Sequence, residues 1–398
     1  MNDLKRFFPA NRIPPEIITI DPGKKEINRN LNWLQDFENV ISQTCRLKNI
    51  LLIVNDAQRS TPTAKILETL DQLDNQFSNK CSVLIATGSH AQPTDGEIKQ
   101  ILGKFIPKQL VIHQAKQSKQ LVKFGTTTRQ NEIWLNKLIN NTDLIITVNS
   151  IEPHYFAGFT GGRKSFLPGV AGYQSIEKNH QFALDPRAKS LNLNDNPVHQ
   201  DMAEALKFVQ TPVQTIQMVT FEHNIIDIFC GDIESSFSRG VELARKLYSI
   251  PVTQPADLVI VEVNEPFSHT LYQAQKALIH GSYAGAKGGE IIFLASCKMG
   301  LGSPAFYHLL STFNTPQQVL DYTEENYKLG YHKAYHMARI AKKMKIYMIS
   351  QLSGEVLSNM FMEKINNPTE KINQYINSGR KIIYLPNGEV TVPCITEG

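Results

Sequence analysis

A glycine-rich stretch near the middle of the chain carries the residues best suited to chemistry. It runs from Pro153 to Ser165, contains His154 and Lys164, and is followed by His180, sixteen residues after the lysine. Five glycines lie between residues 158 and 172, a density typical of backbone that bends tightly or approaches a ligand. A histidine can carry a proton or ligate a metal, and a lysine amine can act as a nucleophile. The stretch therefore predicts a ligand site with acid–base, metal or covalent chemistry.

The same stretch partly matches a phosphate-binding loop of the pattern G-x-x-x-x-G-K-[ST]. Gly158, Lys164 and Ser165 fit the pattern, but Arg163 occupies the position of its second glycine. Residues 151–157 also separate the loop from the strand that a true phosphate loop would follow. A Walker loop is therefore excluded. The backbone could still cradle a phosphate with charge from Arg163 or Lys164, and Lys164 could instead be a covalent attachment point.

The elements that must position these residues are visible as short apolar runs. Runs rich in β-branched residues are typical of strands buried on both faces, which indicates mainly parallel sheets covered by helices. Strands are predicted at Ile17–Ile20, Asn49–Val54, Ser82–Ala86, Leu110–His113, Leu144–Val148, Leu258–Val263, Glu290–Ala295, Ile346–Ile349 and Lys381–Leu385. Helices are predicted at Thr63–Leu73, Thr94–Leu102, Ile133–Ile139, Val198–Phe208, Ser235–Tyr248, Tyr272–His280 and Pro304–Leu310.

The length of 398 residues suffices for two domains. The Pro-rich, uncharged segment Ser249–Pro255 separates a long amphipathic segment from a new apolar run and marks the boundary. We therefore predict an N-terminal α/β domain at 1–250, which includes a hairpin at 218–230, and a C-terminal α/β domain at 251–398. The cleft between the two domains is the expected ligand site.

Composition excludes several classes of protein. The hydrophobic fraction of 41% and the charged fraction of 20% are those of a soluble globular protein. The net charge of +4, without a dense Lys/Arg tract, argues against a nucleic-acid partner. The five cysteines are widely spaced without a CxxC pair, which argues against a disulfide framework and a cysteine zinc site. Met1–Pro15 lacks an apolar signal region and no apolar run has membrane-spanning length, so we expect a cytoplasmic protein without a membrane partner.

Three of the predicted strands in the first half end in reactive residues. Asp56 and Arg59 follow the first of these strands, His90 follows the second and His154 the third. In open α/β sheets, ligands bind beyond the carboxyl ends of the strands. Each residue alone is also explained as a turn or surface residue, but their coincidence at three strand ends favours a site. If the three strands are neighbours, Arg59, His90 and His154 converge on one edge of the sheet.

The second half carries a smaller set of candidates. Tyr272, Gln273 and Lys276 lie within one turn of a predicted helix, and Lys276 is a rather isolated cation suited to holding a carboxylate. His332 and His336 have the i, i+4 spacing of metal ligands, but without a third ligand motif nearby a solvated helix face is the better interpretation.

These motifs, in this order, resemble the nickel-pincer lactate racemase family over essentially the whole chain. The motifs that carry the resemblance are Asp56-x-x-Arg59-x-Thr61-Pro62, Gly88-Ser89-His90, Pro153-His154 through Gly158-Phe159-x-Gly161-Gly162-x-Lys164, His180, Asn196-Pro197-x-His199 and Tyr272-Gln273-x-x-Lys276. The resemblance implies two α/β domains and a racemase or epimerase of a 2-hydroxy acid. One departure is Gly88-Ser89-His90-Ala91 where the family pattern has Gly-Thr-His-Arg, so the substrate is lactate or a related, larger 2-hydroxy acid.

The resemblance also implies a cofactor and its anchors. The cofactor is nickel held by pyridinium-3,5-bisthiocarboxylic acid mononucleotide, which is joined to Lys164 through a thioamide. By resemblance, Gly161 and Gly162 lie beside the cofactor, which gives the glycines of the loop a reason, and His180 supplies the protein ligand to nickel. The implied partners are the proteins that build the cofactor and insert the nickel.

The remaining roles concern the substrate. By resemblance, His90 and His154 are the acid–base pair, Arg59 and Lys276 hold the substrate carboxylate, Asp56 orients Arg59, and Tyr272 and Gln273 line the pocket. Hydride removal from Cα, with a base taking the hydroxyl proton, gives a flat 2-keto acid that can take the hydride back on either face. Two alternatives stay open: a nucleotide-dependent phosphotransferase that uses the Gly158–Ser165 loop, and a non-catalytic metal- or nucleotide-binding protein. The role of His199 is not assigned.

Overall fold

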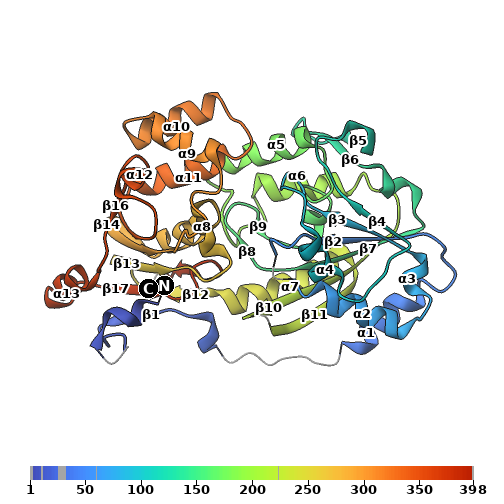
Figure 1. Cartoon of the computed structure of the whole chain (residues 1–398), viewed down its shortest axis with the longest axis horizontal. Coiled ribbons are helices and arrows are strands. Elements are labelled where there is room, and N and C mark those ends of the chain that lie inside the picture. Colours follow the sequence, from blue (N-terminus) through green and yellow to red (C-terminus); the bar gives the residue numbers. More distant parts are fainter. Residues whose placement is uncertain (1–2, 10–11, 26–32, 60, 223, 397–398) are drawn as a thin grey trace. The chain divides into compact units, whose positions relative to one another are not determined.

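The chain folds into two compact units, shown in Figure 1. The structure is a computed structural model, which describes residues 3–9, 12–25, 33–59, 61–222 and 224–396. One unit, here called the N-terminal unit, comprises Glu26–Lys246. The other, the C-terminal unit, combines Met1–Lys25 with Leu247–Gly398. This division differs from a cut at residue 250 mainly in the first residues of the chain, because strand β1 (Ile17–Thr19) pairs in parallel with β17 (Ile382–Leu385).

The N-terminal unit is built on a six-stranded sheet with the order β11-β10-β7-β2-β3-β4. All neighbouring pairs are parallel except β10 and β11, which form an antiparallel hairpin. The strands of this sheet are β2 (Ile50–Asn55), β3 (Cys81–Ala86), β4 (Gln109–Ile112), β7 (Leu144–Ser150), β10 (Val213–Phe221) and β11 (Asn224–Asp232). The predicted α/β class with mainly parallel sheets is confirmed.

The remaining elements of the N-terminal unit are helices and two small hairpins. The hairpin strands are β5 (Leu121–Thr126) with β6 (Glu132–Asn136), and β8 (Pro153–His154) with β9 (Gly158–Phe159). The α-helices are α1 (Leu34–Ser42), α2 (Thr63–Leu73), α3 (Phe77–Lys80), α4 (Asp95–Leu102), α5 (Tyr173–Gln181), α6 (Pro197–Leu206) and α7 (Ile233–Tyr248). Short 3-10 helices are η4 (Ser118–Gln120), η5 (Lys137–Asn141), η6 (Gly162–Ser165) and η7 (Phe182–Leu184).

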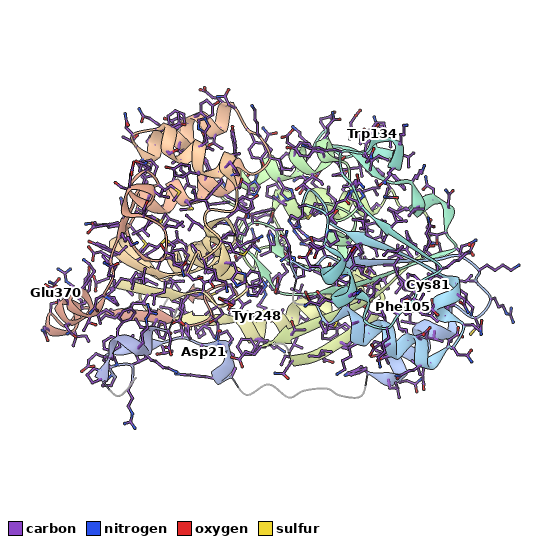
Figure 2. All side chains as sticks on the ribbon, viewed as in Figure 1. Asp21, Cys81, Phe105, Trp134, Tyr248 and Glu370 are labelled. Atoms are coloured by element: carbon purple, nitrogen blue, oxygen red, sulfur yellow. The ribbon has the colours of Figure 1, made fainter. Side chains whose placement is uncertain are left out.

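The core of the N-terminal unit fixes the strand ends on which the site depends. Strand β2 is buried along Ile50–Val54, and apolar residues of α1, α2 and α4 pack with it into one cluster. Cys81 and Phe105, labelled in Figure 2, belong to this cluster. Helix α4 begins at the predicted capping box, in which Thr94 and Glu97 exchange hydrogen bonds with each other's backbone N–H.

One predicted helix, Ile133–Ile139, is wrong. The segment forms β6 and then the short helix η5. Ile133 and Leu135 are fully buried, whereas Glu132 is exposed and Trp134 is half-buried, an alternation of period two that belongs to a strand. The predicted hairpin at 218–230 is confirmed and is longer, since β10 and β11 span 213–232, while His223 at its centre lies outside the described residues.

The C-terminal unit has its own parallel sheet, with the order β1-β17-β13-β14-β15-β16. The further strands of this sheet are β13 (Ala256–Glu262), β14 (Gly285–Leu294), β15 (Lys345–Ile349) and β16 (Met362–Lys364). The unit also contains β12 (Ser249–Val252) and β18 (Val392–Ile395), which pair with each other in a separate two-stranded sheet. Its helices are η1 (Leu4–Phe7), η3 (Pro22–Lys24), η8 (Phe267–His269), α8 (Leu271–Ser282), α9 (Pro304–Thr312), α10 (Pro316–Glu325), α11 (Tyr331–Ala341), α12 (Gly354–Ser358) and α13 (Thr369–Asn377). Across the described residues of both units, every helix is too short or too polar to cross a bilayer.

The histidines of α11 are buried, which makes their predicted place on a solvated helix face wrong. His332 is 3% exposed and His336 is 7% exposed. Helix α11 packs against α8, α9 and α10, and the Nδ1 atom of His332 lies 2.9 Å from the Tyr327 hydroxyl. Both histidines therefore belong to the packed interior of this unit.

A buried carboxyl group at the end of β13 makes the stability of the C-terminal unit depend on pH. The Glu262 side chain accepts hydrogen bonds from the Tyr384 hydroxyl at 2.5 Å and from the Leu4 N–H at 3.1 Å. Burial raises the pKa of Glu262 from 4.5 to about 7. A folded-state pKa above the unfolded value means that the group's stabilisation is fully present below pH 4.5 and is lost as the pH rises through 7.

We predict that Glu262→Gln removes this pH dependence. Relative to the wild type, the free energy of unfolding of the variant should gain roughly 3 kcal/mol between pH 5 and pH 8, since one pKa unit is worth about 1.4 kcal/mol. Urea unfolding at both pH values measures the change. Glu370→Gln on α13, at an exposed glutamate, is the matched control and should leave the pH dependence unchanged. Parallel pH profiles for the wild type and Glu262→Gln would contradict the prediction.

Candidate active site

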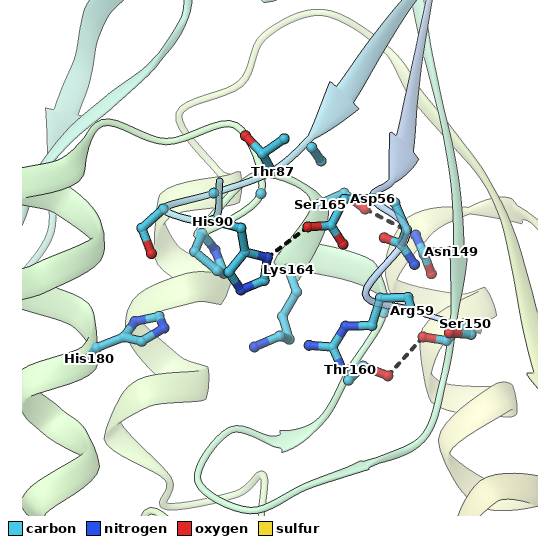
Figure 3. A pocket seen from close by; sticks show the side chains of 17 residues that line it. Asp56, Arg59, Thr87, His90, Asn149, Ser150, Thr160, Lys164, Ser165 and His180 are labelled. Atoms are coloured by element: carbon cyan, nitrogen blue, oxygen red, sulfur yellow. Dashed lines mark hydrogen bonds and ion pairs between the residues drawn. The ribbon is translucent and has the colours of Figure 1, made fainter. Parts of the chain in front are cut away.

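A polar pocket of the N-terminal unit collects most of the residues that the sequence singled out. It lies where β2, β3 and β7 end, and its lining includes Asp56, Arg59, His90, Lys164 and His180 (Figure 3). The pocket encloses about 620 Å³ of space free of protein atoms, open solvent included.

The convergence follows from strand order. Strand β2 lies between β7 and β3 and is parallel to both, so the three predicted strands are neighbours. Their carboxyl ends therefore meet at one edge of the sheet. The hydroxyl of Thr61 ties two of these ends together, because it accepts a hydrogen bond from Asn55 Nδ2 at 2.8 Å and lies 3.0 Å from Ser150 Oγ.

His90 is held by a carboxylate. Its Nδ1 atom lies 2.7 Å from Oδ2 of Asp56, whose side chain is 8% exposed. A carboxylate can only accept, so the neutral imidazole carries its proton on Nδ1 and leaves a lone pair on Nε2. The side chain of His90 is 41% exposed and forms part of the pocket wall. The arrangement resembles a general base oriented by an acid behind it.

Arg59 has a different partner from the predicted one. Its Nη1 atom lies 2.9 Å from Oε1 of Glu152, and both side chains are largely buried. Among the described contacts, Asp56 thus pairs with His90 and Arg59 pairs with Glu152, which corrects the expectation that Asp56 orients Arg59. Sequence reasoning missed Glu152, although it lies at the same strand end, two residues before His154.

His154 is close to this set but is not part of the pocket wall. The side chain is 7% exposed, and Nδ1 accepts the Ala157 N–H at 3.3 Å, which places the proton of a neutral ring on Nε2. Its ring stacks on Tyr155 at 5.1 Å and meets the edge of Phe156 at 4.5 Å between centroids. Phe156 also lies 5.0 Å from the His180 ring and 5.6 Å from the Lys164 amine. Phe156, which the sequence did not single out, therefore joins three of the predicted residues.

The glycines of the loop have a structural reason within the protein itself, and the predicted contact of Gly161 and Gly162 with a cofactor stays a prediction. A Cβ atom on Gly158 would lie 2.2 Å from the Asn192 carbonyl oxygen, and one on Gly169 would lie 2.4 Å from the Ser165 carbonyl oxygen. Gly161 has a φ of +83°, and it lines the pocket. Gly162, with a φ of +52°, packs instead against Phe237 and is absent from the pocket wall. Close packing and left-handed turns of the chain itself thus account for these glycines.

Arg163 does not face the pocket, so the predicted contribution of its charge to a bound phosphate is wrong. The side chain is 3% exposed, and its Nη2 atom donates to the carbonyls of Ala157 at 2.9 Å and Phe159 at 3.0 Å. The guanidinium also lies 4.4 Å from the centroid of the Phe237 ring. Burial lowers the pKa of Arg163 to about 9, so the group stays protonated at neutral pH. It holds the loop in shape from behind.

His199 lies behind the loop as well. Its ring stacks near Phe237 at 6.2 Å. Burial, with a smaller contribution from the Arg163 charge, lowers the pKa of His199 to about 3. His199 is partly exposed and lines a different pocket of this unit together with Arg129 and Glu204. It is absent from the wall of the pocket that contains Lys164, and its role stays unassigned.

The groups able to hold a cofactor or metal are few. Lys164 offers an amine, His180 on α5 an imidazole, and Asn149 a side-chain oxygen that is buried without a hydrogen-bond partner. In the view of Figure 3, the Lys164 side chain lies between those of His180 and Arg59. No cluster of three or more His, Cys, Asp or Glu side chains suited to a metal occurs within the residues that the structure describes.

The candidates of the second half form a separate group on α8. Lys276 has its amine 5.3 Å from the centroid of the Phe267 ring. The amine of Lys333 lies 3.3 Å from the centroid of the Tyr272 ring, and it donates a hydrogen bond to the Tyr272 carbonyl at 2.9 Å. Tyr272, Gln273 and Lys276 belong to the C-terminal unit, and their role at the substrate stays a prediction.

Comparisons with known proteins agree with the motifs. The lactate racemase N-terminal domain matches residues 10–191, and the lactate racemase C-terminal domain matches residues 252–392. The lactate racemase of Thermoanaerobacterium thermosaccharolyticum is 31% identical over 86% of this chain and 83% of its own. The lactate racemase of Lactiplantibacillus plantarum is 29% identical over 85% of this chain and 84% of its own.

A solved structure extends the likeness to the fold. The lactate racemase apoprotein from Thermoanaerobacterium thermosaccharolyticum superposes with a TM-score of 0.84 at 28% sequence identity, covering 96% of each chain. Both domain matches, the identity over most of the chain and the shared fold point to the same group of isomerases. The chain therefore belongs to the lactate racemase family and is an isomerase.

Proposed function

We propose that this protein interconverts the stereoisomers of a 2-hydroxy acid, lactate or a related larger acid, by moving a hydride from Cα and back. The observation that carries the proposal is the pocket at the ends of β2, β3 and β7. It combines a base (His90), a cation for a carboxylate (Arg59), an amine (Lys164) and a metal-ligating imidazole (His180).

The side chains of the pocket suit the nickel-pincer mononucleotide that the family resemblance implies. Lys164 would be joined to the cofactor, and His180 would ligate the nickel, for which imidazole is a suitable donor. The partnerless oxygen of Asn149 offers an acceptor to the bound group. The proposal requires that the other metal donors come from the cofactor. When bound, this group supplies an acceptor that takes hydride from the substrate Cα and returns it to either face.

Arg59 would bind the substrate carboxylate, and the family resemblance implies Lys276 as a second cation. An arginine presents a planar fork that matches a carboxylate with two parallel hydrogen bonds. In the structure, Glu152 occupies one nitrogen of the Arg59 guanidinium. Glu152 thereby orients the fork, which leaves its other nitrogens for the substrate. Two cations on one carboxylate fix the axis about which Cα presents its faces.

The two histidines have complementary protonation in the structure. His90 shows a lone pair at Nε2, since Asp56 accepts its Nδ1–H, and His154 carries the ring proton at Nε2, since its Nδ1 accepts the Ala157 N–H. With these tautomers, His90 would take the hydroxyl proton of the substrate, and His154 would give a proton to the keto oxygen. A racemase needs this exchange in both directions, with one histidine for each hand of the substrate.

The phosphotransferase alternative loses one of its two possible charged anchors, because Arg163 is buried behind the loop, while Lys164 still lines the pocket. The non-catalytic alternative predicts binding without turnover. The substrate itself depends on residues around His90, where Ser89 and Ala91 replace the Thr and Arg of the family pattern. The loss of the arginine next to His90 changes the surroundings of this histidine, which is why the proposal covers more than lactate.

A stereochemical screen tests the proposal. Protein co-expressed with the cofactor-building and nickel-insertion proteins is incubated with single enantiomers of a panel of 2-hydroxy acids, and the opposite enantiomer is measured by chiral chromatography. One acid or a narrow group should racemise or epimerise, and His90→Ala or His154→Ala should reduce the rate by about 10²–10⁴-fold. Nickel-loaded protein that binds a panel acid without inverting it would instead support the non-catalytic alternative.

A further inference from the structure

A buried carboxylate that none of the roles above explains lies behind the His180 helix. Asp201 on α6 is fully buried. Its Oδ1 accepts the Thr127 hydroxyl at 2.6 Å, and its Oδ2 accepts the side-chain amides of Asn131 and Asn179, each at 2.8 Å. Thr127 and Asn131 lie in the turn between β5 and β6, whereas Asn179 lies on α5. One carboxylate thus ties three separate elements together.

Asn179 is the residue immediately before His180. Successive residues on an α-helix are turned by about 100° around its axis. A hydrogen bond that fixes Asn179 toward α6 therefore also fixes the direction in which His180 leaves the helix, toward the pocket that it lines. Asn179 Nδ2 makes a second contact with α6 at the Val198 carbonyl, 3.2 Å away, and its side chain is fully buried.

The start of α5 is also held by hydrogen bonds from residues between and within β5 and β6. Asn131, which donates to Asp201, also donates to the Ser175 carbonyl near the start of α5 at 3.1 Å. The Ser175 hydroxyl in turn accepts the Trp134 N–H of β6 at 2.9 Å. The other end of the arrangement reaches the loop, because Asn196 at the start of α6 donates to the Phe156 carbonyl at 2.8 Å. Phe156 is the ring that contacts both His154 and His180.

We propose that Asp201, acting through Asn179, is the positioning residue that sets the orientation of the His180 imidazole. The inference rests on the proposed function in one respect, since it assigns to His180 the role of metal ligand. Partners that orient a metal-ligating side chain from behind are worth about 10–100-fold in metal affinity in other proteins. Here the orientation is transmitted by the helix backbone.

Two matched substitutions separate positioning from general stability. Asn179→Ala and Thr127→Val each remove one hydrogen bond to Asp201 and one further hydrogen bond, to the Val198 carbonyl and from the Asn131 N–H respectively. Only the first removes the bond between Asp201 and α5. Asp201→Asn supplies a conservative third variant, because its amide oxygen can still accept from Asn131 and Asn179. The first readout is hydrogen–deuterium exchange of peptides from α5 in the protein expressed without cofactor. The second is the rate at which matured protein releases nickel to a chelator, followed by its visible absorption, together with kcat and KM.

Asn179→Ala should raise exchange in α5 and the nickel release rate by about tenfold or more, and lower kcat with little change in KM. Thr127→Val should stay within about twofold of the wild type in both readouts, and Asp201→Asn should lie close to it. Equal effects of Asn179→Ala and Thr127→Val, or an unchanged α5 in Asn179→Ala, would overturn the inference. Absence of nickel from matured wild type would defeat the proposed function alone, because the exchange experiment does not depend on the metal.

Discussion

Lys164→Arg is expected to leave the protein without its cofactor and without racemase activity. Arginine keeps the positive charge and the length of the side chain, but its guanidinium stays protonated and does not act as the nucleophile that an amine provides. The substitution therefore tests attachment rather than charge. The position of Lys164 in the pocket, with its amine 5.6 Å from the centroid of the Phe156 ring, leaves the amine beside the space that the mononucleotide would fill.

Peptide mass spectra of matured protein measure the outcome. The wild type should show a mass increase on the peptide that contains Lys164, and Lys164→Arg should show none, with racemisation reduced by about 10⁴-fold or more, as expected when the group that carries the hard chemistry is lost. Lys189→Arg, at an exposed lysine of the same unit, is the matched control and should keep both the mass increase and the activity. A mass increase retained in Lys164→Arg would place the attachment elsewhere.

The parts of the site that depend on the backbone could be predicted from the sequence. Strands β2, β3 and β7 are buried on both faces, so their near-continuous apolar runs were visible, and the polar residues after each run marked the strand ends. Parallel neighbours then bring those ends together whatever the side chains do. Strand β6 has no such continuous apolar run. It is a short strand of a small hairpin whose apolar residues alternate over only five positions, and it was therefore mistaken for a helix.

The pairing of side chains could not be predicted in the same way. Asp56 and Arg59 are three residues apart, and each could reach several partners. Which one it meets is decided by tertiary distances of an ångström or two. Thr160 fixes the backbone beside Glu152, because its hydroxyl donates to the Ser150 carbonyl at 2.8 Å and accepts the Glu152 N–H at 2.9 Å. The Glu152 carboxylate is thereby held where it pairs with Arg59. Asp56 is thereby left to His90.

Arg163 is another residue whose side-chain contacts could not be predicted from the local sequence. A cation in a glycine-rich loop suggests an anion, and nothing in the local sequence says that it turns inward. Its three-carbon stem reaches carbonyls of the segment that precedes it, and Phe237, from a helix more than seventy residues away in the chain, covers it. A residue that organises the loop was thus taken for one that binds a ligand.

The Asp56–His90 pair should matter to catalysis more than any other pair in the pocket. Asp56→Asn replaces an acceptor by a group that can donate, so the His90 proton is expected to move from Nδ1 to Nε2. The ring then presents N–H where the substrate hydroxyl needs a base. Removal of the carboxylate behind a catalytic histidine costs up to about 10⁴-fold in kcat in other enzymes. We expect a loss of about 10²–10⁴-fold here.

The double variant makes the assignment specific. If Asp56 acts only through His90, then Asp56→Asn combined with His90→Ala should be no slower than His90→Ala alone, because residues that act as one unit are not additive. Asp74→Asn, which also breaks an ion pair in this unit but lies outside the pocket wall, should leave the rate unchanged. Because two enantiomers have equal free energies, kcat/KM must fall equally for both directions of a racemisation. A fall in one direction only would show that the assay follows a different reaction, and additive losses in the double variant would mean that Asp56 has a role apart from His90.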